Sequence, residues 1–518
     1  MGALRDALRV LYHGLPGPLQ RLLRPLVAAV RWLRGAPAQP AKAIEPLAPG
    51  RQRALEVARA ARAAFDAARF GEVLSVVDAL DGCWDSEDLV CGDLLRARVL
   101  KARSLFALGR PGDCEQWLDR LEQAMGVTHE TLLVRARLRQ YQSRYADGLA
   151  LVERALLLQP GKRFRIEDPS ESILLKVELL TLLERRAEAA TFFRGAFPAA
   201  SALGPWVERK LSCLRRTVAS PADLQAFKDY LLPLFAVDGQ RALAALLQYS
   251  LAARDLGCHE EARAAIAHRF IQGTRQCGLG SRKRPPDRDW TASARTALLD
   301  LREDLDAAGV EFFLISGTLL GCIREGAILG HDKDIDVGVH ADAGFDRVRA
   351  AVATSGRFAA LPVITERILR LKHASGVMID VFFHWLEDGR CWHEGQKTRW
   401  WNTPFDLVPA DFLGERFLVP AQADLYLTEN YGDWRVPQVD FETFSDTPNM
   451  ELADLDELRW YYLRALFDHY HSGRIGLFEK VWSNLAGIHE PGGDLLLAVE
   501  RVRRKALEAG RASQEEHP

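Results

Sequence analysis

Hydrophobic positions recur at three- and four-residue spacing through the first half of the chain. Between about residue 50 and residue 270 the sequence is rich in Ala, Leu and Arg and has few β-branched runs, which predicts a series of amphipathic helices. After residue 290 the pattern changes, and short apolar or alternating runs typical of β-strands follow helix-like segments. The chain is therefore predicted to be multidomain, with an α-helical part followed by an α/β domain built on a mixed sheet.

One phrase recurs within the helical part. Its copies, each a short turn followed by a helix with one apolar face, read AARFGEVLSVVDAL, LGRPGDCEQWLDRL, QSRYADGLALVERAL and LERRAEAATFFRGAF. The equivalent positions are Arg69, Arg110, Arg144 and Arg185, at steps of 41, 34 and 41 residues. A weaker fifth copy, LGCHEEARAAI, begins at Leu256.

This recurrence resembles tetratricopeptide-like helix pairs and predicts a solenoid over residues 46–272. A single pair cannot bury its apolar face, so neighbouring pairs must stack. The groove of such a solenoid either binds a protein partner or positions a glycan, or else the solenoid only supports the next domain. The sequence leaves these alternatives open, because no residue in this part resembles a catalytic one.

Residues 1–45 form a separate basic segment. On a helical wheel drawn over 18–34 the arginines share one side and the leucines share the other. Such a helix either lies on an anionic membrane surface or packs against the next domain. Its most apolar run, PLVAAV at 25–30, is too short to span a bilayer, which takes about 20 residues.

Charge and cysteine content narrow the class of protein further. The 518 residues carry a formal charge of −2, which argues against a nucleic-acid partner. The eight cysteines include no C-x-x-C pair, so neither a structural zinc site nor a disulfide framework is expected. We therefore expect a cytoplasmic protein, with peripheral contact at the inner face of the membrane if the basic segment binds lipid.

Residues 273–289 contain Gly, Pro and clustered charge and are interpreted as a linker. The predicted catalytic domain then spans 290–450, and a helical extension with a polar tail spans 451–518. Within the domain the pattern predicts a helix over 291–310 and a buried strand over 310–316. A Gly-Thr turn and a short helix follow this strand.

Three acids make this region a candidate for chemistry. In DIDVGVH, Asp334 and Asp336 alternate with apolar residues and so project from one face of a strand. Asp380 is the only acid within the apolar run GVMIDVFFHW, where it is costly unless a cation faces it. Carboxylate oxygens are the ligands that Mg²⁺ prefers, so the three acids predict a metal site. Whether Asp332 joins them is left open by the sequence.

The turn before the acidic strand offers a place for phosphate. Ser316, Gly317 and Thr318 end one predicted strand and open a helix, where backbone N–H groups and hydroxyls can bind anions. Arg324 and Lys333 are candidates for steadying phosphate charge. An acidic triplet alone is more often a solvated or calcium-binding loop, but the EF-hand pattern of Gly and Glu is missing here.

Two separated blocks resemble the LicD/fukutin family of phosphotransferases, which has the nucleotidyltransferase fold. They read SGTLLGCIREGAILGHDKDIDVGV, from Ser316, and FLVPAQADLYLTENYGDWRVP, over 417–437. The resemblance implies that Asp334 and Asp336 are the metal-binding pair and that Asp380 is the third acid.

The same resemblance implies that Gly317 and Thr318 hold the donor phosphate and that Arg324 is the arginine of the first motif. The chain departs from many bacterial members at His331 and Lys333, where an aromatic and an acidic residue are common. This departure argues against choline as the head group of the donor more than it argues against the transfer reaction itself.

The resemblance implies a Mg²⁺- or Mn²⁺-dependent phosphotransferase. It would move a substituted phosphate, such as phosphocholine or a polyol phosphate, from a CDP-activated donor to a sugar hydroxyl of a cell-surface glycan or glycolipid, as in lipopolysaccharide or capsule biosynthesis. The sequence leaves two alternatives open. One is a nucleotidyltransferase that moves a nucleoside monophosphate from a triphosphate, and the other is a repeat-based adaptor with a degenerate transferase domain.

Overall fold

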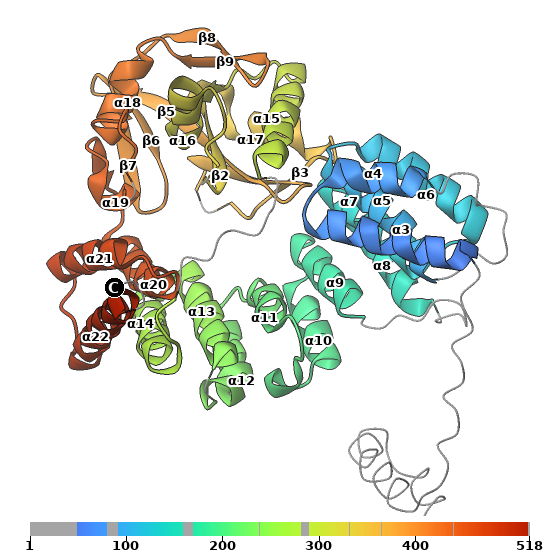
Figure 1. Ribbon diagram of the computed structural model, residues 1–518, viewed down its shortest axis with the longest axis horizontal. Coiled ribbons are helices and arrows are strands. Elements are labelled where there is room, and N and C mark those ends of the chain that lie inside the picture. The colour runs from blue at the N-terminus through green and yellow to red at the C-terminus, as the bar shows by residue number, and fades with distance from the viewer. Residues whose placement is uncertain are drawn as a thin grey trace, which may run out of the picture. The chain divides into compact units, whose positions relative to one another are not determined.

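The computed structural model describes most of the chain beyond the basic segment (Figure 1). The described ranges are 49–79, 92–158, 169–237, 239–280, 290–330, 332–363, 365–438 and 440–515. The prediction for residues 1–45 and the larger part of the predicted linker lie outside them. Among the described residues, no helix is long and apolar enough to cross a membrane.

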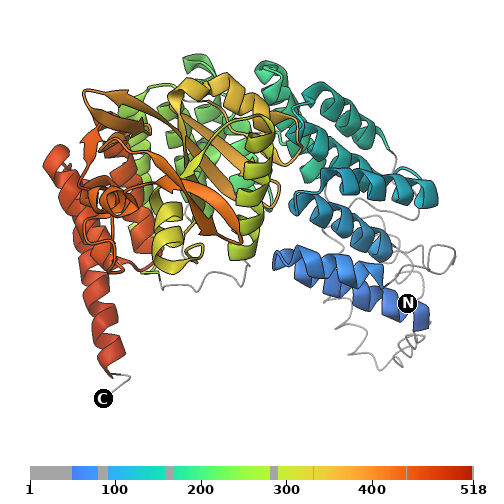
Figure 2. The same ribbon diagram turned by 90° about the horizontal axis from the view of Figure 1, so that it is seen from above.

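Helices make up the first half of the described chain, as the spacing of its apolar residues predicts. Their bounds are α3 Pro49–Asp66, α4 Phe70–Asp78, α5 Gly92–Ala107, α6 Pro111–Met125, α7 His129–Tyr141, α8 Tyr145–Leu157, α9 Ser170–Leu182, α10 Arg186–Ala196, η2 Ala200–Ala202, α11 Val207–Arg215, α12 Pro221–Phe235, α13 Gln240–Asp255 and α14 His259–Gln276. Figure 2 shows successive helices lying side by side, and we call this set the helical array. Helix α14 extends into the predicted linker and ends at Gln276.

The recurring phrase corresponds to one kind of turn. Before each equivalent arginine stands a residue with positive φ, which reverses the chain between two helices: Ala68, Gly109, Ser143 and Glu184. Each arginine is the N-cap of the second helix and pairs with an acid three residues later, as Arg144 does with Asp147 at 2.6 Å and Arg185 with Glu188 at 2.7 Å. The repeat in the sequence is therefore a repeat of helix–turn–helix units.

Among the described residues the same turn occurs twice more. Gly257, with a φ of 73°, precedes Cys258 at the N-cap of α14, which is the weak fifth copy. Gly473, with a φ of 68°, precedes Arg474 at the N-cap of α21. This last copy lies in the carboxy-terminal extension, where the sequence pattern did not reveal it because a different domain intervenes.

The carboxy-terminal helices complete the helical array. They are α20 Leu455–His471, α21 Ile475–Ile488 and α22 Gly493–Glu515. Their apolar residues share one core with α7 to α14, and Figure 1 shows them beside α13 and α14. Trp460 Nε1 donates a hydrogen bond of 2.6 Å to Ser250 Oγ, and Gly280 N donates one of 3.2 Å to Tyr470 O. The segment 290–452 is therefore inserted into the array, and 455–515 is part of the same helical core.

The inserted domain is built on a ten-stranded mixed sheet. Its strands are β1 Phe313–Leu314, β2 Asp334–His340, β3 Phe358–Ala360, β4 Ile368–His373, β5 Met378–Glu387, β6 Arg390–Glu394, β7 Thr398–Asn402, β8 Leu407–Phe412, β9 Glu415–Pro420 and β10 Met450–Leu452. The order is β10-β7-β6-β5-β2-β1-β9-β8, with β4 pairing β5 and β3 at a branch. Pairs β2–β5 and β1–β9 are parallel and the others antiparallel.

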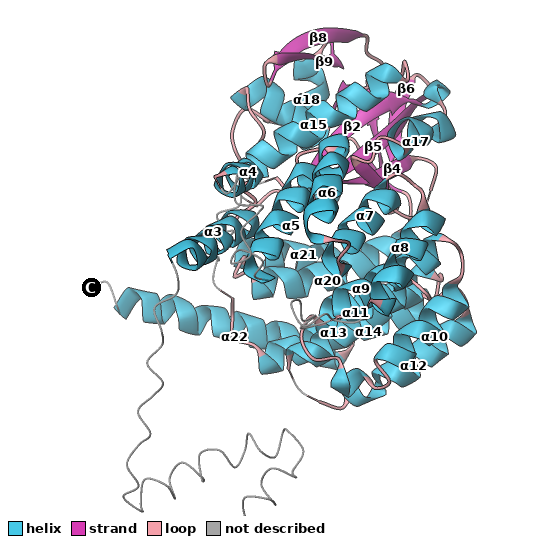
Figure 3. Cartoon of the chain, turned by 90° about the vertical axis from the view of Figure 1, so that its right-hand side faces the viewer, coloured by secondary structure: helices cyan, strands magenta, loops and turns pink. Residues whose placement is uncertain are grey.

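The helices of this domain are α15 Trp290–Ala307, α16 Ser316–Leu320, α17 Phe345–Ala353, α18 Ala423–Tyr431 and α19 Thr443–Asp446, with a π-helical turn at Gly321–Glu325 and a 3₁₀ turn at Ala341–Ala343. Figure 3 shows α15, α17 and α18 around the strands. The predicted order of a helical part followed by a mixed-sheet domain is confirmed. The strand expected over 310–316 is shorter than predicted and comprises only β1.

The two faces of the central strands differ in character. Ile335, Val337 and Val339 of β2 are buried in one core with the alternate residues of β5 and with α15 and α17. Because side chains alternate across a strand, Asp334, Asp336 and Asp380 all project from the opposite face. We call this the acid face of the sheet.

Candidate active site

The three acids meet because β2 and β5 are parallel neighbours. Asp336 and Asp380 lie directly opposite each other in the register, and Asp334 precedes Asp336 by two residues on the same face. One carboxylate oxygen from each of the three acids lies within 4.8 Å of the others, and all three residues are half-buried. The structure thus brings together the three acids that the sequence singled out, and their binding of a metal remains a prediction.

The electrostatics of this cluster favour a cation. Burial, and then the charges of Asp334, Asp380 and Asp332, raise the pKa of Asp336 well above its ordinary value. Burial, followed by the charge of Asp334, raises the pKa of Asp380 to about 6. Burial also raises the pKa of Asp334, while Lys333 lowers it. Three carboxylates with only oxygen ligands fit a hard divalent cation, which would relieve their mutual repulsion.

The turn over Ser316, Gly317 and Thr318 supports the acidic strand. Thr318 is buried, and its Oγ1 accepts a hydrogen bond of 3.0 Å from the amide of Asp336. Ser316 has a φ of 48°, which is uncommon for a residue with a side chain. A Cβ on Gly317 would stand 2.5 Å from Asp332 Oδ2, so glycine lets this carboxylate approach the turn. Donor-phosphate binding by these three residues remains a prediction.

Arg324 joins the two motif blocks that lie far apart in the sequence. Its Nη1 donates a hydrogen bond of 3.1 Å to the carbonyl of Trp434, and its Nε contacts Glu325 at 2.9 Å. Tyr431, in the same block as Trp434, stands near the acids: burial, then Asp336 and Asp332, raise its pKa. The hydrogen bond from Arg324 therefore ties the second block to the first.

Asp332 and Lys333 lie beside the cluster. Asp332 Oδ1 accepts a hydrogen bond of 3.1 Å from the amide of Lys333, and its charge contributes to raising the pKa of Asp336. Its carboxylate is not part of the group within 4.8 Å that the described residues form. The Lys333 side chain is close enough to Asp334 to lower the pKa of that acid.

Two cations at the site were not predicted from the sequence. Arg370 of β4 lies directly opposite Asp380 in the register, so Asp336, Asp380 and Arg370 form one row across three strands. Lys397, in the turn between β6 and β7, is the other. Both lower the pKa of Asp380. Nothing in the sequence showed which strand Arg370 would neighbour.

The amine of Lys397 lies in largely apolar surroundings. Its Nζ lies 4.4 Å from the ring centroid of Phe444 and 5.1 Å from that of Tyr461. Burial lowers its pKa to about 8, against the charge of Glu457, which raises it. An ammonium group in such surroundings is weakly hydrated and available to an anionic ligand.

The histidines near Asp380 in the sequence have structural contacts. His373 is buried on the face away from the acids, where its Nε2 lies 2.9 Å from Asp300 and its Nδ1 2.8 Å from Ser375 Oγ. His384 lies on the acid face but is stacked on His393, with ring centroids 4.5 Å apart. Neither is placed to act on a substrate at the acid cluster.

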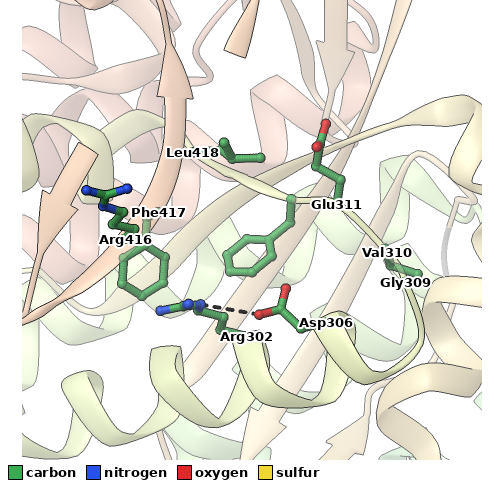
Figure 4. Close-up of a pocket in the computed structure, with 9 residues that line it drawn as sticks. Arg302, Asp306, Gly309, Val310, Glu311, Arg416, Phe417 and Leu418 are labelled. Atoms are coloured by element: carbon green, nitrogen blue, oxygen red, sulfur yellow. Dashed lines mark hydrogen bonds and ion pairs between the residues drawn. The ribbon is translucent and has the colours of Figure 1, made fainter. Parts of the chain in front are cut away.

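A surface pocket of about 260 Å³ lies elsewhere on the domain (Figure 4). It is lined by the end of α15, the segment before β1, and β9: Arg302, Asp306, Gly309, Val310, Glu311, Phe312, Arg416, Phe417 and Leu418. Arg302 is held there by Asp306 at 3.3 Å. The pocket lining includes none of the three acids, so this pocket is not the candidate active site.

Comparison with known proteins fits this geometry. Residues 309–420 match the family described as LicD/FKTN/FKRP, nucleotidyltransferase domain, and all three acids lie inside that range. This part of the chain is similar to the LicD/fukutin family. The match extends over neither the helical array nor the block around Trp434.

Individual relatives agree with the family match. The chain is 27% identical over 171 residues to the ribitol-5-phosphate transferase FKTN of Homo sapiens, covering 31% of this chain and 37% of that protein. It is 25% identical over 210 residues to the protein of the same name from Mus musculus, covering 38% and 43%. The chain thus spans less than half the length of these relatives.

Proposed function

We propose that this protein transfers a polyol phosphate from a CDP-activated donor to a sugar hydroxyl of a glycan or glycolipid, with Mg²⁺ or Mn²⁺ at the acid cluster. The observation that carries the proposal is the convergence of Asp334, Asp336 and Asp380 inside the family-matched segment. The relatives are named as ribitol-5-phosphate transferases, which favours a polyol phosphate over phosphocholine as the transferred group.

The residues of the site have distinct tasks in this reaction. The acceptor oxygen forms a bond to the transferred phosphorus, the bond from that phosphorus to CMP breaks, and the hydroxyl proton must be taken up. Asp380, with its pKa raised to about 6, is the candidate base for this proton. A divalent cation held by the acids would neutralise the diphosphate and the CMP leaving group.

Positively charged side chains of the protein can stabilise the same phosphate charge. Arg370, in register with Asp380, and Lys397, which lowers the pKa of that acid, are both near enough to stabilise negative charge that develops on the phosphate. Arg324 and Lys333 remain candidates for the donor side of the site. The helical array is proposed to be a tetratricopeptide-like solenoid that presents the acceptor.

Asp336→Asn tests the proposal directly. The amide keeps the shape of the side chain and removes its charge, so CMP release from CDP-ribitol with Mg²⁺ should fall by about 100-fold or more, because a metal ligand is lost. The exposed Asp342 provides the matched control, and Asp342→Asn should retain activity. Circular dichroism must show that both variants are folded.

Two outcomes would contradict the assignment. If Asp336→Asn turns over CDP-ribitol with unchanged dependence on Mg²⁺, the acids do not hold the catalytic cation. If the chain instead releases pyrophosphate from nucleoside triphosphates and ignores CDP donors, it is a nucleotidyltransferase. Isothermal calorimetry with CDP-ribitol, with and without EDTA, separates loss of donor binding from loss of turnover.

A further inference from the structure

The hairpin formed by β6 and β7 folds over the acid face of the sheet. In its first half β5 pairs with β4, through residues 378–382, so β6 pairs with β5 only beyond this stretch. Phe382 lies on the acid face, two residues after Asp380. The centroid of its ring lies 5.5 Å from that of His393 and 6.4 Å from that of Trp400. Both strands of the hairpin therefore pack on the side of the sheet that carries the acids.

The tip of the hairpin reaches back toward the level of Asp380. Because β6 runs antiparallel to β5, each residue beyond His393 lies closer to the start of β5. The turn closes with a hydrogen bond of 3.0 Å from Gly395 N to Thr398 O, and Lys397 lies within it. Extending the antiparallel register brings Lys397 level with Asp380, in agreement with the lowering of the pKa of that acid by the lysine.

The helical array holds this tip in place. Lys397 O accepts a hydrogen bond of 2.9 Å from Ala453 N and another of 3.0 Å from Asp454 N. Asp454 is the N-cap of α20, where its Oδ1 accepts a hydrogen bond of 2.8 Å from Asp456 N. The backbone of the hairpin tip is thus tied to the first turn of a helix that belongs to the core of the array.

The ammonium of Lys397 is held by aromatic rings. Its Nζ lies 4.4 Å from the ring centroid of Phe444 and 5.1 Å from that of Tyr461, which belongs to α20. Tyr461 OH donates a hydrogen bond of 3.0 Å to Glu442, which fixes this ring. Lys397 is half-buried, and in the described part of the chain its ammonium forms no ion pair with a carboxylate. An unpaired charge in such a place is costly, and a phosphate oxygen would offset the cost.

Charged groups from several elements act on this ammonium. Burial lowers its pKa to about 8, and the charge of Glu457 in α20 raises it. Three arginines lower the pKa further: Arg254 of α13, Arg464 of α20 and Arg370 of β4. All but Arg370 belong to the helical array, which therefore influences the charge state of a side chain beside Asp380.

We propose that helix α20 of the helical array positions Lys397 as a cation that contacts the transferred phosphate. Lys397 is then a catalytic residue, and Tyr461 is a positioning residue that acts through it. A lysine side chain is flexible, and an ammonium that two rings already hold needs less ordering when phosphate binds. The inference rests on the proposed transferase function and goes beyond it, because it makes the array part of the catalytic unit.

Removing the charge of Lys397 tests its contact with the phosphate. Lys397→Met keeps the length of the side chain, and CMP release from CDP-ribitol with Mg²⁺ should fall about 100-fold in the full chain. Calorimetry should show an affinity for CDP-ribitol within about threefold of that of the unaltered chain, because the contact strengthens in the transition state. Lys397→Arg keeps a charge and should be about tenfold faster than Lys397→Met.

Lys176 of α9 provides the matched control. Its Nζ also lies over a ring, 4.6 Å from the centroid of Phe192, and it pairs with Glu153 at 2.8 Å. Lys176→Met should release CMP as fast as the unaltered chain does.

The pH dependence of turnover reports the charge state of Lys397. The ammonium must be protonated to contact the phosphate, so turnover should decline as the pH rises through about 8. In Lys397→Arg this decline should be absent, because a guanidinium group stays charged. Glu457→Gln removes a charge that raises the pKa of Lys397, so the decline should begin at a lower pH. A purely structural role of α20 would not move the pH profile.

Two changes at Tyr461 separate positioning from folding. Tyr461→Phe keeps the ring under the ammonium and removes only the hydrogen bond to Glu442, so turnover should be retained. Tyr461→Leu removes the ring and should lower turnover about fivefold, because the attraction between ring and cation is lost. Circular dichroism must show that both variants are folded.

The outcomes that overturn the inference differ from those that overturn the proposed function. The inference is wrong if Lys397→Met turns over CDP-ribitol as fast as Lys176→Met, or if Tyr461→Leu behaves as Tyr461→Phe does. It is also wrong if Lys397→Arg retains the decline above pH 8. In each of these cases CMP release by the unaltered chain leaves the proposed function standing. If the unaltered chain releases no CMP from CDP-ribitol, the proposed function fails and the inference fails with it.

Discussion

At the residue scale, Thr318 shows how the turn and the acid cluster are linked. Its hydroxyl accepts the hydrogen bond of the Asp336 amide, which fixes the backbone that carries the central acid. Asp336 in turn lies opposite Asp380 on β5. A small side chain at the start of α16 thus sets the position of the most strongly perturbed carboxylate in the site.

Removing that hydroxyl should destabilise the protein and loosen the cluster. Thr318→Val keeps the shape but leaves the amide of Asp336 without this partner, so urea unfolding should show a loss of about 1–3 kcal/mol in unfolding free energy. The rise in melting temperature on adding Mg²⁺ should also shrink. Thr318→Ser keeps a hydroxyl and serves as the control. Equal behaviour of the two variants would show that the hydrogen bond is unimportant.

At the element scale, β5, β6 and β7 carry a stack of rings on the acid face. His384 and His393 have centroids 4.5 Å apart, and His393 stacks on Trp400 at 5.3 Å. Burial lowers the pKa of His393 to about 3, and burial together with His393 lowers the pKa of His384 well below its ordinary value. Within the described part of the chain, His384 Nε2 and His393 Nδ1 have no hydrogen-bond partner. The strands therefore hold two neutral imidazoles.

Acid should weaken the fold through this stack. A histidine whose pKa is lowered in the folded state costs no stability while it is neutral in both states, above its pKa of about 6.5 in the unfolded chain. As the pH falls from there toward the pKa of the folded state, the unfolding free energy decreases by about 1.4 kcal/mol per pH unit for each histidine. His393→Phe should therefore lose less unfolding free energy than the unaltered chain between about pH 6.5 and pH 4.5, measured by urea unfolding. Phe382→Leu, a neighbour without a titrating group, should lower stability at every pH without changing the slope. If the unfolding free energy of His393→Phe depended on pH as steeply as that of the unaltered chain, His393 would not be buried in its neutral form.

At the scale of the whole molecule, the inserted domain interrupts a helical array that resumes after it. Gly273 of α14 is a point of close approach, because a Cβ there would stand 2.0 Å from the ring of Phe467 in α20. Core packing across α14 and α20 therefore ties residues before the domain to residues after it.

A methyl group at this contact should destabilise the array. Gly273→Ala should lower the unfolding free energy by about 1–3 kcal/mol, because the Phe467 ring must move. Gly195→Ala, in α10, is the matched control. Among the described residues no neighbouring atom lies within 4 Å of the position that its Cβ would take, so this change should be neutral or stabilise by up to about 1 kcal/mol through helix propensity. Thermal unfolding measures both. Equal effects of the two changes would show that α20 does not pack on α14 as described.

Local chemistry determined much of this protein from the sequence alone. The alternation in DIDVGVH placed Asp334 and Asp336 on one strand face, since side-chain direction in a strand has a period of two. The isolated charge of Asp380 in an apolar run marked it as a candidate for function. The recurring turn phrase predicted helix pairs, because each copy combines a short turn with a helix that has one apolar face. These features depend only on residues close together in the chain.

Other features were decided by tertiary structure. Only the pairing of β4 with β5 placed Arg370 beside Asp380, and only the turn between β6 and β7 brought Lys397 to the site. The return of α20–α22 to α14 joins segments far apart in the sequence. No local pattern encodes such neighbours, because they follow from which strands pair and which apolar faces pack together. The acids could therefore be found by reading the chain, whereas the cations around them required the fold.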